Sequence, residues 1–178
     1  MKRLFFVALA LASGALLSTA ADKPRKLVLI AGKPSHPPGM HEFRAGALLL
    51  QQCLAATPGV SVSVHANGWP ESNAAFNGAD AVIIYCDGGA KHPAIQEDHK
   101  QILAGLAKKG VGIGFMHYGV EVVADQAGAE FKRWIGGHYE NAYSCNPIGE
   151  PSFESFRGHP VTRGVKPFTI KDEWYFNM

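Results

Sequence analysis

Three short apolar runs constrain the fold of this 178-residue chain more than any other feature. They span residues 26–32, 79–86 and 111–117, they are rich in Val and Ile, and glycine or a polar turn ends each of them. Short runs of this kind are typical of strands buried on both faces of a parallel sheet. A fourth segment, residues 60–65, alternates Val with Ser and His, which predicts a strand with one exposed face.

Segments with helical periodicity lie between these strands. Apolar residues recur every three or four positions in two of them, namely Phe43, Ala47, Leu50 and Leu54 in the first and Ile95, Ile102, Leu103 and Leu106 in the second. Pro58-Gly59 ends the first helix, and the second is expected to begin at Pro93. This alternation predicts an α/β fold with three layers: a flavodoxin-like, mainly parallel sheet with helices on both faces.

The first 21 residues have the pattern of a secretory signal peptide. Lys2 and Arg3 precede an apolar run, and Ala20-Ala21 supplies the small residues that favour cleavage. We therefore expect residues 1–21 to be removed and residues 22–178 to form one exported domain, periplasmic or secreted, without a permanent membrane span. An uncleaved membrane anchor is the alternative. The apolar end of the sequence predicts that the domain is truncated at its C-terminal side.

Charge and cysteine content narrow the classes of function. Removing Lys2 and Arg3 reduces the basic residues from 17 to 15, equal to the 15 acidic ones. No basic stripe favours nucleic acid as a partner. Cys53, Cys86 and Cys145 are too widely spaced to suggest a zinc site made of cysteines. Whether Cys86 and Cys145 form a disulfide stays open.

Polar residues gather on the loops that follow the predicted strands. Ligands of open parallel sheets bind at the carboxyl ends of the strands. The loops that leave those ends carry His36, His41, Glu42, Arg44, Asp87, His92, His117, Tyr118 and Glu121. Four of the eight histidines are among them, and clustered titratable groups favour acid–base chemistry. We therefore expect a substrate to bind at this edge of the sheet.

His117, the last residue of the run 111–117, is the leading catalytic candidate. A sharp turn from a strand into a helix is where α/β proteins hold a reactive side chain above the sheet, and an imidazole transfers protons near neutral pH. On a helix, Glu121 would lie one turn above His117 and accept a hydrogen bond from its ring. The plainer alternatives are a hydrogen-bonded core histidine and a surface glutamate. The other loop residues can equally be solvated groups or caps of turns.

A metal site is a further alternative. His36, His41 and His117 with one carboxylate could ligate a divalent metal such as Zn²⁺. Their spacing matches no compact metal-binding motif. No other cofactor is predicted, and the presence of metal stays open.

Several motifs together resemble the ThuA-like (trehalose utilisation) domain, over essentially the whole chain after the signal peptide. The segments that carry the resemblance are residues 32–36, 41–46, 67–70, 86–89, 117–118, 134–137, 159–164 and 172–175. The resemblance implies the fold of class I glutamine amidotransferases. In that superfamily the turn reads Gly-x-Cys-x-Gly, whereas His117 stands here in place of the nucleophilic Cys, which argues against glutaminase chemistry.

The resemblance also implies sugar metabolism, with Glu173 and Tyr175 closing the cleft. The sequence therefore predicts an exported enzyme that acts on a keto-disaccharide or glycoside by acid–base chemistry, with His117 moving the proton and Glu121 orienting it. The loop residues and Tyr118 would hold sugar hydroxyls. A non-catalytic sugar-binding or scaffold module and a metal-dependent hydrolase are the alternatives.

Overall fold

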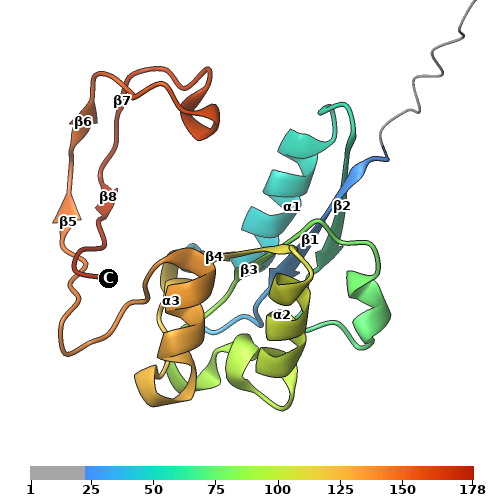
Figure 1. The fold of residues 1–178 in the computed structure, drawn as a ribbon. Coiled ribbons are helices and arrows are strands. Elements are labelled where there is room, and N and C mark those ends of the chain that lie inside the picture. The colour runs from blue at the N-terminus through green and yellow to red at the C-terminus, as the bar shows by residue number, and fades with distance from the viewer. Residues whose placement is uncertain (1–22) are drawn as a thin grey trace, which may run out of the picture.

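A computed structural model describes residues 23–178 of the chain (Figure 1). The signal peptide predicted over residues 1–21 lies outside the described residues and stays a prediction. Within residues 23–178, none of the helices combines the length and the apolar character needed to cross a membrane.

Four parallel strands form the central sheet. They are β1 (Arg25–Ala31), β2 (Val60–His65), β3 (Ala81–Tyr85) and β4 (Gly112–Met116), in the order β2-β1-β3-β4. β1 is central, and its Ile30 pairs in register with His65 on one side and Ile84 on the other. The chain leaves β1 toward β2 and returns to β3, so the direction of winding reverses beside β1, as in flavodoxin-like sheets. The predicted fold class is confirmed.

Helices cover both faces of this sheet (Figure 1). They are α1 (Phe43–Leu54), α2 (His99–Lys108) and α3 (Ala129–Ile135). Leu29 shares a buried cluster with Phe43 of α1, whereas its neighbour Ile30 lies in the opposite cluster with Leu103 of α2 and Phe131 of α3. Successive side chains of a strand point to opposite faces, so the continuous apolar run of β1 supplies both halves of the core.

Short helical turns connect the elements, at Asn73–Phe76, Gly89–Lys91, Pro93–Ile95, His117–Val120, Ala124–Gly128 and Pro160–Thr162. One continuous helix from Pro93 was expected, and the structure differs. The first turn stops at Ile95, and α2 begins only at His99. Glu97 between them has a left-handed backbone, with φ of 46°, which interrupts the helical hydrogen-bond pattern.

Residues 147–174, here called the arm, extend beside the sheet (Figure 1). Two pairs of short antiparallel strands form it: β5 (Ile148–Gly149) with β8 (Asp172–Glu173), and β6 (Ser152–Phe153) with β7 (Phe168–Thr169). The Phe153 ring lies 5.0 Å from that of Phe168 and 5.3 Å from that of Trp174. Beyond the arm, Tyr175 returns to the body of the molecule, where its ring lies 5.5 Å from that of Tyr139.

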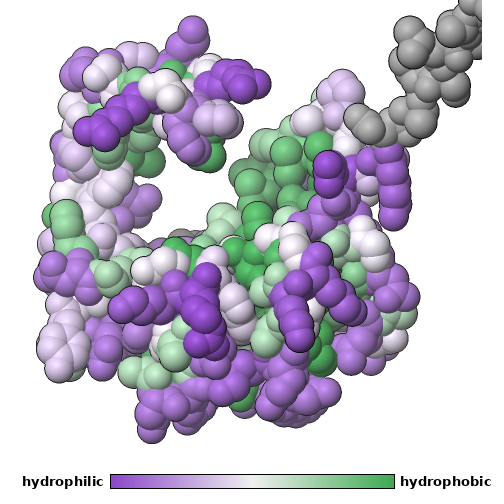
Figure 2. Space-filling view, viewed as in Figure 1, coloured by the Kyte–Doolittle hydropathy of each residue, from purple (hydrophilic) through white to green (hydrophobic). Residues whose placement is uncertain are grey.

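Figure 2 shows apolar side chains gathered over α1, whose exposed apolar residues are Leu48 and Leu49. The three cysteines are unpaired: Cys53 and Cys145 are exposed and Cys86 is buried. The disulfide between Cys86 and Cys145 that the sequence left open is therefore not formed in this structure.

Candidate functional site

The carboxyl edge of the sheet brings together four residues from three separate loops. His36 and His41 lie between β1 and α1, Asp87 follows β3, and His117 follows β4. The ring of His41 lies 3.9 Å from that of His36 and 4.7 Å from that of His117. Three of the histidines and one of the carboxylates that the sequence placed at one rim therefore do meet there, with His41 at their centre.

His41 and His117 both have left-handed backbones. His41 has φ of 51° and His117 has φ of 52°. This region is unfavourable for residues with a Cβ, by roughly 1–2 kcal/mol each. At position 117 the strained residue directly follows β4 and opens the turn His117–Val120, so its side chain is presented at the strand end, as in the nucleophile turns of α/β enzymes.

A series of hydrogen bonds runs through His117. Its Nε2 lies 3.2 Å from His41 Nε2, and its Nδ1 lies 3.2 Å from Tyr175 Oη. The Tyr175 hydroxyl donates to Glu173 Oε2 at 3.1 Å. Because that proton is committed to Glu173, the Tyr175 oxygen accepts from His117 Nδ1–H. His117 Nε2 then accepts from His41 Nε2–H, which leaves His41 Nδ1 as a bare lone pair.

The shifts in pKa favour the neutral forms of His117 and Tyr175. Burial lowers the pKa of His117 below its ordinary value, the nearby His41 lowers it further, and the Glu173 carboxylate opposes both. Burial, with the adjacent Glu173, raises the pKa of Tyr175. A neutral imidazole and a protonated phenol are the forms that the hydrogen-bond directions require.

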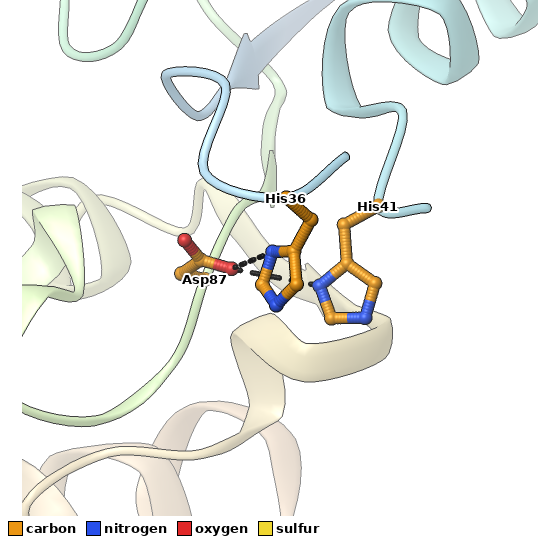
Figure 3. Close-up of side chains that lie close together, drawn as sticks. All are labelled: His36, His41 and Asp87. Atoms are coloured by element: carbon orange, nitrogen blue, oxygen red, sulfur yellow. Dashed lines mark ion pairs between the residues drawn. The ribbon is translucent and has the colours of Figure 1, made fainter. Parts of the chain in front are cut away.

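Asp87 faces both loop histidines (Figure 3). Its Oδ1 lies 3.5 Å from His36 Nδ1 and 3.5 Å from His41 Nδ1. Among the described residues, His41 Nδ1 and Asp87 Oδ1 are buried atoms without a hydrogen-bond partner. Ser35 Oγ lies 2.8 Å from His36 Nδ1. These three residues also form a group whose ligand atoms could hold a metal ion.

Glu121 does not orient His117, contrary to the prediction. Both ring nitrogens of His117 are engaged by His41 and Tyr175, and Glu121 Oε1 instead accepts from Asn141 at 3.1 Å. The prediction assumed a helix after the turn, but Glu121 is extended, with φ of −85° and ψ of 129°. The spacing of four residues brings side chains together only on a helix.

His92 does not reach the rim either. Its side chain is fully buried, with 0% exposure. Its Nδ1 accepts from Ala94 N at 2.9 Å, and its Nε2 donates to the Gly119 carbonyl at 2.9 Å. Burial lowers the pKa of His92 to about 4. This histidine supports the turn after β4 from beneath, and both of its ring nitrogens are used within the protein.

The remaining predicted residues surround the histidines. Glu42 accepts from Gly39 N at 2.7 Å. Arg44 is exposed in the first turn of α1, and with His36, His41 and Glu42 it lines a small pocket of about 200 Å³. The ring of Tyr118 lies 5.6 Å from that of His41. A larger hollow of about 570 Å³ lies on the arm among residues 154–167, away from this cluster.

Sequence reasoning missed two residues that support the site, Tyr85 and Asn141. Tyr85, the last residue of β3, has its ring 6.4 Å from that of His117. A Cβ at Gly46 would come within 2.6 Å of that Tyr85 ring, so the glycine in α1 makes room for it. The strand position of Tyr85 just before Cys86-Asp87 could have indicated it, whereas nothing local indicates that Asn141 meets Glu121.

No protein-family model matches this sequence, and no curated protein matches it. Two solved structures share its fold at 17% sequence identity each. A protein described as ThuA-like from Bacteroides uniformis ATCC 8492 covers 89% of this chain with a TM-score of 0.61. Another, described in the same way, from Parabacteroides merdae ATCC 43184 covers 86% with a TM-score of 0.55. This chain spans 64% and 63% of those two proteins.

The resemblance that the sequence motifs predicted is thus confirmed in the fold: the chain has the α/β fold of ThuA-like proteins, consistent with that of class I glutamine amidotransferases.

Proposed function

We propose that this chain is an exported, carbohydrate-active enzyme domain that acts on a keto-disaccharide or glycoside by acid–base chemistry at His117. The observation that carries the proposal is the hydrogen-bonded series from His41 through His117 and Tyr175 to Glu173. It lies at the edge where parallel sheets bind their ligands. The proposal of export rests on the sequence of residues 1–21.

The series suits a general base. His117 Nε2 can take a proton from substrate once the substrate displaces the His41 N–H that otherwise donates to it. The positive charge that then forms on the ring faces a phenol whose own proton is held by the Glu173 carboxylate. That carboxylate stabilises the imidazolium without itself touching the substrate. A C–H next to a carbonyl, as in a keto-sugar, is acidic enough for a positioned imidazole to remove. Position 117 carries no thiol, which argues against glutaminase chemistry at this turn.

The test is a screen of oxidised and unoxidised disaccharides, with products detected by mass spectrometry. We expect His117→Asn to lower turnover about 10²- to 10⁴-fold, the usual contribution of a general base. Asn tolerates the left-handed backbone of this position, so the fold should survive. Tyr175→Phe should lower turnover less, because it removes a positioning contact and leaves the base.

Two exposed residues supply matched controls. Tyr143 is 73% exposed, and His159 lies on the arm, so Tyr143→Phe and His159→Asn should leave turnover unchanged. Full turnover by His117→Asn on every active substrate refutes the catalytic role. Sugar binding measured by calorimetry, with no product after long incubation, would instead identify a non-catalytic sugar-binding module.

A further inference from the structure

Three electron-pair donors converge beside the His117 series. Asp87 Oδ1 is 3.5 Å from each of two imidazole nitrogens, His36 Nδ1 and His41 Nδ1. Each of the three residues offers one ligand atom that lies within 4.8 Å of those of the other two (Figure 3). In a tetrahedral zinc site with bonds of about 2.0–2.2 Å, ligand atoms are about 3.4 Å apart. Two of the three separations therefore already match those between ligands of one ion.

Hydrogen bonds do not account for this convergence. The direction of the series through Tyr175 leaves His41 Nδ1 without a proton. Within residues 23–178, His41 Nδ1 and Asp87 Oδ1 are both buried without a partner. Two acceptors that face each other repel, and a buried acceptor without a partner loses the hydrogen bond that it makes to water in the unfolded chain. A cation between them removes both penalties.

We propose that His36, His41 and Asp87 form a binding site for one divalent first-row transition metal, and that His117 is its outer partner. Histidines that ligate metals donate their second ring N–H to another group, which fixes the tautomer. Here His41 Nε2–H donates to His117 Nε2 at 3.2 Å. The metal site thus shares His41 with the proposed acid–base series, but it does not depend on that function.

Two imidazoles and one carboxylate suit Zn²⁺ and its neighbours in the first row. Three protein ligands leave a coordination position for water or a substrate oxygen. His36, His41 and Arg44 also line a pocket of about 200 Å³. Ser35 Oγ lies 2.8 Å from His36 Nδ1, and metal binding exchanges that contact for a coordination bond. Because Ser35 is exposed, water can replace the lost partner.

A second group of possible ligands provides a comparison within the same chain. Glu97, Asp98 and His99 also bring three ligand atoms together. Its carboxylates are exposed, His99 Nδ1 is hydrogen-bonded to the Pro93 carbonyl at 2.7 Å, and the His99 ring stacks on Trp69 at 4.0 Å. No buried acceptor is left unpaired there, so we assign no metal to it.

The test is calorimetric titration of the chelator-stripped, desalted protein with Zn²⁺, with Co²⁺ absorption as a second reading of the ligand set. We expect one ion per chain. Asp87→Asn and His41→Asn should each weaken Zn²⁺ binding by at least about 100-fold, and His117→Asn by about 10- to 100-fold. Glu97→Gln should leave the affinity unchanged. Circular dichroism checks that each variant is folded, and Asp87→Asn, which keeps the size of the side chain, decides the matter if His41→Asn does not fold.

Absence of one-to-one binding, or an affinity that Asp87→Asn leaves intact, overturns the proposal. Equal weakening by Glu97→Gln does so too, because it moves binding to the exposed acidic group. These titrations contain no substrate. A failure of metal binding is therefore distinguishable from a failure of the acid–base proposal, which is read only from turnover.

Discussion

Acidification should destabilise this protein through His92, the buried histidine beneath the turn after β4. The ring is fully buried, and its centroid lies 5.3 Å from that of Phe115 and 5.3 Å from that of Phe131. Its two nitrogens are used by Ala94 N and the Gly119 carbonyl. Protonation would place an N–H at His92 Nδ1, directly facing the Ala94 N–H that now donates to that nitrogen. The folded state therefore holds His92 neutral.

The sign and size of this change in stability follow from the pKa of His92. Folding lowers the pKa of His92 from 6.5 to about 4. Between these values the unfolded chain binds a proton that the folded chain does not, so stability is lost as the pH falls. This loss of stability is negligible above about pH 7 and reaches its full size below the pKa of the folded state. Each pKa unit corresponds to about 1.4 kcal/mol, which gives a loss of about 3 kcal/mol in all and slightly less by pH ~4.5.

Urea unfolding at about pH 7.5 and about pH 4.5 measures this loss. Other groups titrate in the same range, so the quantity of interest is the difference between wild type and His92→Gln. The variant is expected to be less stable near neutrality, because it loses the imidazole contacts, but to lose about 2–3 kcal/mol less on acidification. Equal losses for the two proteins would show that His92 is not held neutral by burial.

Three further predictions concern backbone conformation and glycine positions. At the left-handed position 117, His117→Gly should be more stable than His117→Ala by about 1–2 kcal/mol in urea unfolding, and the opposite order would contradict the backbone strain. Gly105→Ala in α2, where a Cβ meets no neighbour, should instead raise the free energy of unfolding by about 1 kcal/mol. Gly88→Ala should lower the thermal midpoint strongly, since its Cβ would lie 2.5 Å from the Tyr118 carbonyl oxygen, and an unchanged midpoint would mean that the two loops are not packed as described.

The sheet could be predicted from the sequence because its information is local. The runs around Ile30, Ile84 and Phe115 are apolar on successive residues, as strands covered on both faces must be. Their order along the chain, with helical segments between, leaves few arrangements for a parallel sheet. The carboxyl ends of those strands then had to share one edge, which is why His41 and His117 were expected at the same rim.

The errors at the site came from treating proximity in sequence as proximity in space. Glu121 lies four residues from His117, yet the chain between them is a 3₁₀ turn followed by extended backbone. His92 follows a strand end, yet its ring turns inward under Gly119. Tyr175 lies 58 residues from His117. Family resemblance indicated this tyrosine, but its contact with the ring is set by the docking of a distant segment and has no local signature.

The site therefore has two parts, one carried by the loops of the central sheet and one by a distant C-terminal segment. His36, His41, Asp87 and His117 stand on loops of the central sheet, and the proposed metal ligands all belong to that part. The proton series needs in addition Glu173 at the end of the arm and the segment that follows it. The antiparallel bridge between Cys145 and Phe176 holds that segment in place beside Tyr175. Loosening that segment would separate Tyr175 and Glu173 from His117 while leaving His41 Nδ1 facing Asp87. The proposed metal binding and the proposed proton transfer are therefore separable at one rim, joined only through the hydrogen bond between His41 and His117.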